Sequence, residues 1–310
     1  MTYYEKDPVQ GDSSTEVEIL GRRYDYCRVV KDNKHLRTSF DALAKKTFGL
    51  SFEQWYKNGW WREKYIPHSL VHNGEVVANV SANIIDTLHN GSKKRFIQLG
   101  TVMTDKKYRS QGLSRFLMNA VVAEWDKKCD GIYLYANDSV LGFYPRFGFR
   151  VSYEHRYSVA VAGNGSTPVK LNMDNKDDVA LLLKKYQSGN PYSRLQTVGC
   201  EGLLMFYCSQ FMKNDVYYIR ELDTAVIAEY DGDSVTICDI FGDSGKALIE
   251  IIPTLAGLGT KRAVLGFTPL DASGFECSVI EKADTTFFVH NSSRSIFNDE
   301  KTMFPLLSHA

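Results

Sequence analysis

The sequence predicts an α+β protein with two domains, each a mixed, mostly antiparallel twisted sheet flanked by helices. Its 310 residues exceed what one typical core organises, which favours two domains. Short segments that alternate apolar and polar residues meet at tight turns such as Asn73-Gly74 and Asp231-Gly232, a pattern typical of antiparallel hairpins. The order of strand-like and helix-like segments in the first half recurs in the second half, which indicates a repeated architecture.

The composition is that of an ordinary soluble globular protein, with 44% hydrophobic and 24% charged residues. The 37 basic and 37 acidic side chains cancel, which argues against nucleic acid as a partner. The longest apolar runs fall short of the ~18 residues that a membrane span needs, and the polar N-terminus lacks the pattern of a signal peptide. Six scattered cysteines without Cys-x-x-Cys spacing predict buried thiols in a reducing cytoplasm and no metal site.

The first half contains ten predicted helices and strands after a loose polar arm that carries one further short strand. In chain order they are the arm at 1–16 with a short strand at 17–20, a strand at 24–30, a helix from Asn33 or Thr38 to Thr47, a short helix from Ser51, strands at 66–71, 75–85 and 94–104, a helix at 113–128, a strand at 132–135, a short helix at 139–147 and a strand at 151–162. Gly49 would close the first helix, and Ser51 with Gln54 would form a capping box at the second.

The segment from Arg109 to Ser114 lies between a predicted strand and the long helix that follows it. The first turn of a helix has unpaired backbone N–H groups and the positive end of the helix dipole, so it attracts anions. Gly112 lacks a side chain where a phosphate would approach the backbone, and Arg109 adds a positive charge beside it. The sequence therefore predicts a phosphate site at this turn.

Two segments of the first half resemble motifs of the GNAT superfamily, the N-acyltransferases that use acetyl-CoA. Arg109-x-x-Gly112-x-Ser114 resembles the family's pyrophosphate loop, Arg/Gln-x-x-Gly-x-Gly/Ala, with serine at the last position. Asn137 followed by Phe143-Tyr144-x-x-x-Gly148-Phe149 resembles the family's Asn…Phe-Tyr-x-x-x-Gly-Phe segment. The resemblance covers roughly residues 20–160 and implies that residues 1–162 form a GNAT acetyl-CoA-binding catalytic domain.

The resemblance implies a role for each matching residue. The diphosphate would be held by Arg109, Ser110, Gln111, Gly112, Leu113 and Ser114, and the pantetheine amides would pair with the main chain of Val102, Met103 and Thr104. Asn137 would hydrogen-bond the cofactor arm, although Asn137 also suits a simple turn. Tyr144 would protonate the departing thiolate, since a phenol pKa near 10 is close to that of a thiol; the alternative is a packed tyrosine.

The acceptor side is less defined by the sequence. The cluster Trp55, Tyr56, Trp60 and Trp61 is either a hydrophobic plug over the sheet or, as the resemblance favours, a wall of the acceptor pocket. The general base stays open among His72, Glu75, Asp86 and the C-terminus, because some two-domain relatives place the terminal carboxylate in the active site. His309 and Ala310 are the C-terminal candidates, and the alternative is a tail packed over a sheet edge.

The second half begins after the linker at 162–168, and residues 168–310 are expected to form a degenerate GNAT-like domain. Its predicted elements are a strand at 169–171, helices at 174–186 and 197–211, strands at 216–220, 224–230 and 234–241, a helix from 242 to 258 and a strand at 261–267. The loop Phe241–Lys246 lacks both the GNAT and the P-loop spacing and has Asp243 where phosphate would lie. We therefore expect Asp243 and Ser244 to cap a helix, and this domain to complete the acceptor pocket or to dimerise.

These expectations describe an N-acetyltransferase, an acyltransferase of class EC 2.3.1.-, that uses acetyl-CoA as cosubstrate. The acetyl group would pass directly to a primary amine of a small molecule or peptide in a ternary complex, because no Cys-His or Ser-His-Asp arrangement is detectable. The alternative is a non-catalytic acyl-CoA-binding sensor or assembly protein. Aminoglycosides, polyamines, amino acids and peptide N-termini remain open as acceptors, and an exposed second sheet would allow a homodimer.

Overall fold

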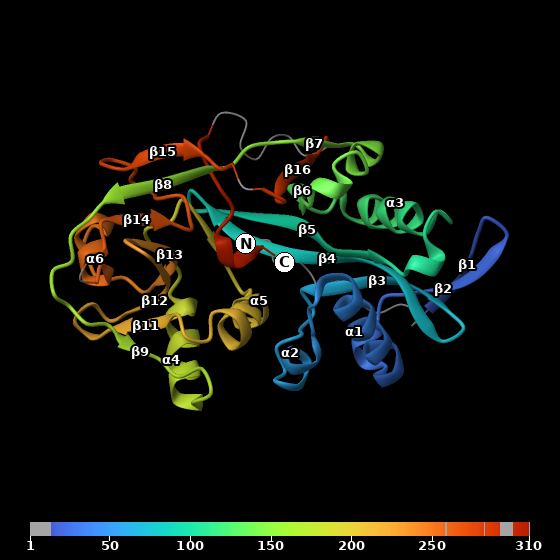
Figure 1. The fold of residues 1–310 in the computed structure, drawn as a ribbon, viewed down its shortest axis with the longest axis horizontal. Coiled ribbons are helices and arrows are strands. Elements are labelled where there is room, and N and C mark those ends of the chain that lie inside the picture. The colour runs from blue at the N-terminus through green and yellow to red at the C-terminus, as the bar shows by residue number, and fades with distance from the viewer. Residues whose placement is uncertain (1–13, 258, 282, 292–299, 310) are drawn as a thin grey trace.

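The computed structural model describes residues 14–257, 259–281, 283–291 and 300–309, and it consists of two twisted sheets lying side by side with helices around them (Figure 1). The first sheet has the strand order β1-β2-β3-β4-β5-β6-β16-β7, with β10 paired to β4. The second has the order β15-β8-β14-β13-β12-β11-β9. Neighbouring strands are antiparallel except for the pairs β5/β6 and β13/β14, so the predicted mixed, mostly antiparallel α+β class is confirmed.

The bounds of the elements are as follows. The strands are β1 (Ser14–Ile19), β2 (Arg22–Cys27), β3 (Tyr65–His72), β4 (Glu75–His89), β5 (Ser92–Thr104), β6 (Gly131–Ala136), β7 (Phe149–Val151), β8 (His155–Ala160), β9 (Val169–Lys170), β10 (Leu195–Thr197), β11 (Val216–Ile219), β12 (Thr224–Asp231), β13 (Ser234–Phe241), β14 (Arg262–Leu265), β15 (Glu276–Val279) and β16 (Thr286–His290). The α-helices are α1 (Lys34–Phe48), α2 (Glu53–Lys57), α3 (Leu113–Trp125), α4 (Lys176–Gln187), α5 (Glu201–Phe206) and α6 (Leu248–Leu255).

Some helices are capped by the residues that the sequence predicted, and others are capped by different residues. Asn33 caps α1 by accepting from the backbone of His35 and Leu36, and Gly49 ends it in the left-handed conformation, as expected. The predicted capping box at Ser51 is wrong, because the Ser51 hydroxyl donates to the Asp41 carboxylate and α2 begins after Phe52. In α4 the cap is Asn175 rather than Asp174.

The first sheet is covered by helices on both faces (Figure 1). On one face α3 packs through apolar residues at helical spacing, of which Leu113, Leu117, Val121 and Trp125 are buried. On the other face α1 and α2 pack over a separate aromatic core that includes Phe40. Helices therefore pack on both faces of the strands that carry the predicted site.

Strands are exchanged between the two sheets. The segment predicted as one strand at 151–162 divides into β7, which stays in the first sheet, and β8, which joins the second. In return β16, which the sequence analysis did not predict, enters the first sheet between β6 and β7. The proposed boundary at 162–168 lies in residues that form neither helix nor strand, but the sheets do not divide the chain cleanly there.

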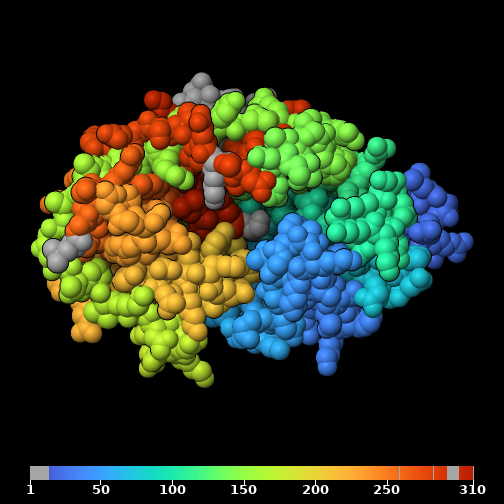
Figure 2. Space-filling model, in the orientation of Figure 1, coloured from blue at the N-terminus to red at the C-terminus, as the bar shows by residue number. Residues whose placement is uncertain are grey.

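The helix predicted at 197–211 is interrupted. Residues 195–197 instead form β10, which pairs with the end of β4, and α5 starts only after Gly199. Gly199 adopts a positive φ of 62°, which a helix cannot continue through. The break turns α5 toward α2, and Figure 2 shows these surfaces (yellow and blue) in contact.

Candidate active site

The centre of the first sheet opens where β5 and β6 part. These parallel strands pair only between residues 96–99 and 131–134. Beyond Leu99, β5 stays paired to β4 on its other side, with a register shift and a positive φ of 49° at Thr101. Residues 100–104 therefore present a strand edge that is unpaired on the β6 side. An edge of this kind can pair with an extended ligand as it would with another strand.

The N-terminus of α3 lies beside this edge. Gly112 is its N-cap with a positive φ of 81°, and no side chain caps the helix end. The Oγ1 of Thr104 and the Oγ of Ser114 are 2.7 Å apart, which ties β5 to the helix, and the Arg109 Nε donates to the Thr104 carbonyl over 3.3 Å. The helix end thus keeps free N–H donors, with one exposed guanidinium next to it.

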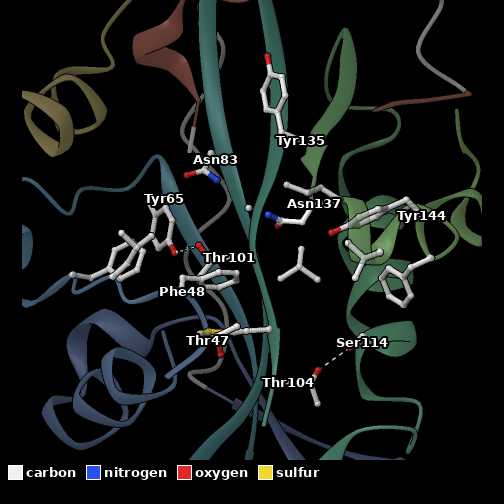
Figure 3. A pocket seen from close by; sticks show the side chains of 18 of the residues that line it. Thr47, Phe48, Tyr65, Asn83, Thr101, Thr104, Ser114, Tyr135, Asn137 and Tyr144 are labelled. Atoms are coloured by element: carbon white, nitrogen blue, oxygen red, sulfur yellow. Dashed lines mark hydrogen bonds between the residues drawn. The ribbon is translucent and has the colours of Figure 1, made fainter. Parts of the chain in front are cut away.

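A cavity of about 970 Å³ extends from this helix end along the gap between the strands (Figure 3). Of the predicted site residues, the ones that line it are Val102, Met103, Thr104, Arg109, Ser114, Asn137 and Tyr144. Ser110, Gln111, Gly112 and Leu113 do not line it. Gln111 instead accepts from Arg22 of the β1–β2 hairpin, and Leu113 is buried in the core.

Tyr144 faces the cavity from the short helix η4 (Tyr144–Phe147), and its hydroxyl points inward (Figure 3). Its ring packs against Phe143, Phe149 and Phe288, and only 5% of the residue is exposed. Burial raises the pKa of Tyr144 to about 12. Among the described residues its hydroxyl has no hydrogen-bond partner, so its proton is available to a bound molecule.

Asn137 is held in place by the second half of the chain. Its Nδ2 donates to the Asp284 carboxylate over 2.9 Å, and the same carboxylate accepts from the backbone of Asp138 over 2.8 Å. These hydrogen bonds, that from Asn137 first, lower the pKa of Asp284 and keep it ionised. Sequence reasoning could not find Asp284, because it is 147 residues away along the chain.

The opposite wall of the cavity is aromatic and comes from both halves. Phe52, Trp55 and Tyr65 line it from the first half, and Leu203 and Phe206 line it from α5. Of the aromatic cluster whose role the sequence left open, Trp55 and Trp61 are both buried in the aromatic core, and Trp55 also lines the cavity. The role of Trp55 as a wall of an acceptor pocket stays a prediction.

The candidate bases among the described residues do not line the cavity. The His72 ring bonds the Tyr108 hydroxyl over 2.9 Å, and Glu75 bonds Ser39 near the start of β4. Burial alone would raise the pKa of Asp86, but hydrogen bonds from Arg95 and Lys64 outweigh it and lower that pKa. His309 packs on Tyr135, with ring centroids 4.1 Å apart, beside a second cavity, and Ala310 lies outside the described residues.

The corresponding turn of the second half has no free helix end. Asp243 and Ser244 do not cap the helix as predicted, because their side chains accept from Gly245 and Lys246 within the preceding turn. The start of α6 is closed instead by Glu250, which accepts from the backbone of Ala247. Carboxylates therefore occupy the region where a phosphate would bind in the first half.

Comparison with known proteins identifies the class. Residues 36–149 match the profile of the Acetyltransferase (GNAT) family, so the chain contains a GNAT acetyltransferase domain over these residues. No curated protein matches the chain in sequence. Within the described ranges, no helix has the length and apolar character to cross a membrane, and no three His, Cys, Asp or Glu side chains are grouped to hold a metal.

Solved structures share the fold over most of the chain. A GCN5-related N-acetyltransferase from Kribbella flavida is 15% identical with a TM-score of 0.51, covering 83% of this chain and 69% of that chain. Eis1 from Mycobacterium abscessus is 14% identical with a TM-score of 0.50, covering 81% and 69%. A GCN5-related N-acetyltransferase from Anabaena variabilis is 11% identical with a TM-score of 0.52, covering 86% and 72%. At these identities the similarity establishes the fold alone.

Proposed function

We propose that this protein is an N-acetyltransferase that moves the acetyl group of acetyl-CoA to a primary amine by direct attack in a ternary complex. The observation that carries the proposal is the position of Tyr144. Its unpartnered hydroxyl faces the same cavity as the uncapped end of α3. Ser114 at this helix end and Tyr144 thus line one cavity across the gap between β5 and β6, which supports a phosphate site and a proton donor within reach of the same ligand.

The residues present fit acetyl-CoA. The N–H groups of α3 and the Arg109 guanidinium would hold the diphosphate, and the unpaired edge of β5 at Val102–Thr104 would pair with the pantetheine amides. Asn137 would fix the arm from the other side of the gap. A main-chain N–H near Val102 would polarise the thioester carbonyl. Bound in this way, the cofactor would point its sulfur toward Tyr144.

In the proposed reaction the amine nitrogen forms a bond to the carbonyl carbon as the carbon–sulfur bond breaks. Tyr144 gives its proton to the departing sulfur, and the proton lost by the amine returns to the phenolate through water. The raised pKa keeps the phenol protonated across the physiological pH range. It also makes proton transfer less favourable than for an ordinary phenol, a cost that the sequence could not show.

Release of free thiol from acetyl-CoA with a panel of amines tests this proposal. Tyr144→Phe should lower kcat by ~10²–10⁴-fold, because only the proton donor is removed. Tyr108→Phe is a matched control, since its hydroxyl bonds His72 outside the cavity. Calorimetry should show that Tyr144→Phe still binds CoA. Binding without turnover for any amine would favour the rival function, a non-catalytic acyl-CoA sensor.

A further inference from the structure

We infer that the acceptor is a primary amine carried on a flat, apolar body such as an aryl group. This inference rests on the proposed acetyl transfer and names the class of molecule that receives the acetyl group. The cavity has two chemically different ends. The end at α3 carries Arg109 and hydroxyl groups, whereas the end between α2, β3 and α5 is built from aromatic rings and Leu203.

The rings of the second end form a preformed slot. Phe52 and Phe206 stack with centroids 5.6 Å apart and an interplanar angle of 21°, and Trp55 meets Phe206 edge-on at 5.4 Å. Offset and edge-to-face contacts are the arrangements that aromatic rings favour, so these rings hold one another in position. A further flat ring can extend this packing with little reorganisation.

The slot is fixed by hydrogen bonds at its two sides. The Trp55 Nε1 donates to the Gly202 carbonyl over 2.7 Å, which attaches α5 to α2. A Cβ on Gly202 would lie 2.5 Å from the Trp60 carbonyl oxygen, so glycine is what permits this approach. The Tyr65 hydroxyl lies 2.7 Å from the Thr101 Oγ1. The slot therefore exists before an acceptor enters.

Charge argues against a polycation. Of the described residues that line the cavity, the charged ones are Arg109 at the α3 end and Asp284, whose carboxylate is committed to Asn137 and Asp138. Several ammonium groups would lose their hydration here without acidic side chains to pair with. A monoamine loses the hydration of only one ammonium group. Apolar surroundings also lower the pKa of that group, which favours the neutral amine that attacks the thioester.

Asn83 supplies the polar contact that an amine needs. Its Nδ2 donates to the Gln98 carbonyl over 3.2 Å, which leaves its Oδ1 without a partner among the described residues. Asn83 and Tyr144 face the cavity from opposite sides (Figure 3). An acceptor with its body in the slot can donate an N–H to Asn83, and this contact orients the nitrogen toward the thioester.

The test compares acceptors at fixed acetyl-CoA by thiol release. Tryptamine and 2-phenylethylamine represent the inferred class, n-butylamine is a control without a ring, and spermidine and an aminoglycoside represent polycations. The aryl amines should exceed n-butylamine in kcat/KM by ~10–100-fold, the effect of burying one aromatic group. Spermidine should fall below n-butylamine.

Two variants locate the effect. Phe206→Leu should lower kcat/KM for tryptamine by about tenfold and leave n-butylamine within about twofold, since only the ring contact is lost. Leu203→Asp should add a carboxylate to the slot, weaken tryptamine and raise spermidine turnover. Ile249→Ala, on the exposed surface of α6, is the control that should change neither acceptor.

The outcomes separate the two proposals. Turnover that favours spermidine or the aminoglycoside, or an equal loss for tryptamine and n-butylamine in Phe206→Leu, overturns the aryl acceptor and leaves acetyl transfer intact. A donor preference for octanoyl-CoA over acetyl-CoA, abolished by Phe206→Leu, would assign the slot to the acyl chain and also overturn the inference. Absence of turnover with every amine, while calorimetry still detects CoA binding, removes the proposed function and this inference with it.

Discussion

Both halves of the chain contain a strand–helix–strand crossover between two parallel strands. The gap at the ends of these strands is an open cavity in the first half and is filled by the chain itself in the second. In each half a helix joins two parallel strands, β5 to β6 through α3 and β13 to β14 through α6. Each second strand is then flanked by an antiparallel strand from the other half, β16 beside β6 and β8 beside β14. The architectures correspond, so the differences lie in the loops and in what occupies the strand ends.

In the second half the chain itself occupies those ends. The Leu306 N–H donates to the Gly266 carbonyl directly after β14, which places the 3₁₀ helix η7 (Leu306–Ser308) at the crossover. In the first half the corresponding region is the cavity lined by Tyr144. The comparison teaches that the gap at the ends of two parallel strands can be filled by a later segment of the chain, as in the second half, or stay open as a cavity, as in the first.

The largest expected effect is on CoA binding, and it comes from giving the turn before α3 an acidic side chain like that of the turn before α6. Ser114→Asp would place a carboxylate at the free end of α3, where it would compete with phosphate for the same N–H groups. We expect the Kd for CoA to rise by ~10²–10³-fold with the helix retained, measured by calorimetry and circular dichroism. Ser244→Asp in the second loop is the matched control, and a CoA affinity within about threefold of the parent for Ser114→Asp would contradict the phosphate site.

An added side chain at the tightly packed end of β14, in the second half, should destabilise the fold without affecting the cavity. In Gly266→Ala, the added Cβ would lie 2.7 Å from the Cys238 Cα and 2.8 Å from its carbonyl oxygen, so main chain must move. We expect a loss of about 3 kcal/mol in the free energy of unfolding, measured with urea. CoA affinity should stay constant below the transition, and a parallel loss of affinity would show that the two crossovers are coupled.

Glu154 lies on the link between β7 and β8, where the chain passes from one sheet to the other. It is buried, and its Oε1 accepts from the Tyr135 hydroxyl over 3.0 Å and from the Phe304 backbone over 2.7 Å. Burial raises the pKa of Glu154 to about 7. Its stabilising contribution is therefore complete below the unfolded pKa near 4.5 and is lost as pH rises through about 7.

Glu154→Gln should remove this part of the pH dependence. The variant keeps the acceptor oxygen and cannot ionise, so at pH 8 it should be more stable than the parent by about 3 kcal/mol, with little difference near pH 4. Denaturant unfolding between pH 4 and 8 measures this. Asp239→Asn is the counterpart in the second sheet, because burial raises the pKa of Asp239 to about 7 as well. An unchanged slope in Glu154→Gln would show that this carboxyl ionises freely in the folded state.

The smallest effect is expected at the contact between Asn137 and the second half. Asp284→Asn should keep the shape of the side chain but lose the charge-assisted hydrogen bonds that its carboxylate accepts from Asn137 and Asp138, and solvent weakens these bonds because Asp284 is exposed. We expect KM for acetyl-CoA to rise by about twofold to fivefold with kcat nearly constant. A fall in kcat alone would indicate that Asp284 acts on the chemical step.

The sequence predicted what local spacing encodes. The hairpin at Asn73-Gly74, the end of α1 at Gly49 and the turn at Gly112 all depend on glycine or asparagine at positive φ, and all are present. Seven of the eleven predicted site residues line the cavity, because strand, turn and helix bring near neighbours together. Contacts between distant parts of the sequence could not be predicted. β16, Asp284 and Phe206 reach the site through tertiary contacts, and such contacts do not produce a recognisable spacing of residues along the chain.

The exchanged strands have a consequence for any attempt to dissect the chain. A fragment ending at the linker would lack β16, and with it the Phe288 ring that supports Tyr144. The complementary fragment would lack β8 and would leave β14 and β15 without the strand that lies between them. Neither fragment contains a complete sheet. The intact chain should therefore unfold in a single transition, and the two separate fragments should fold only when they are mixed.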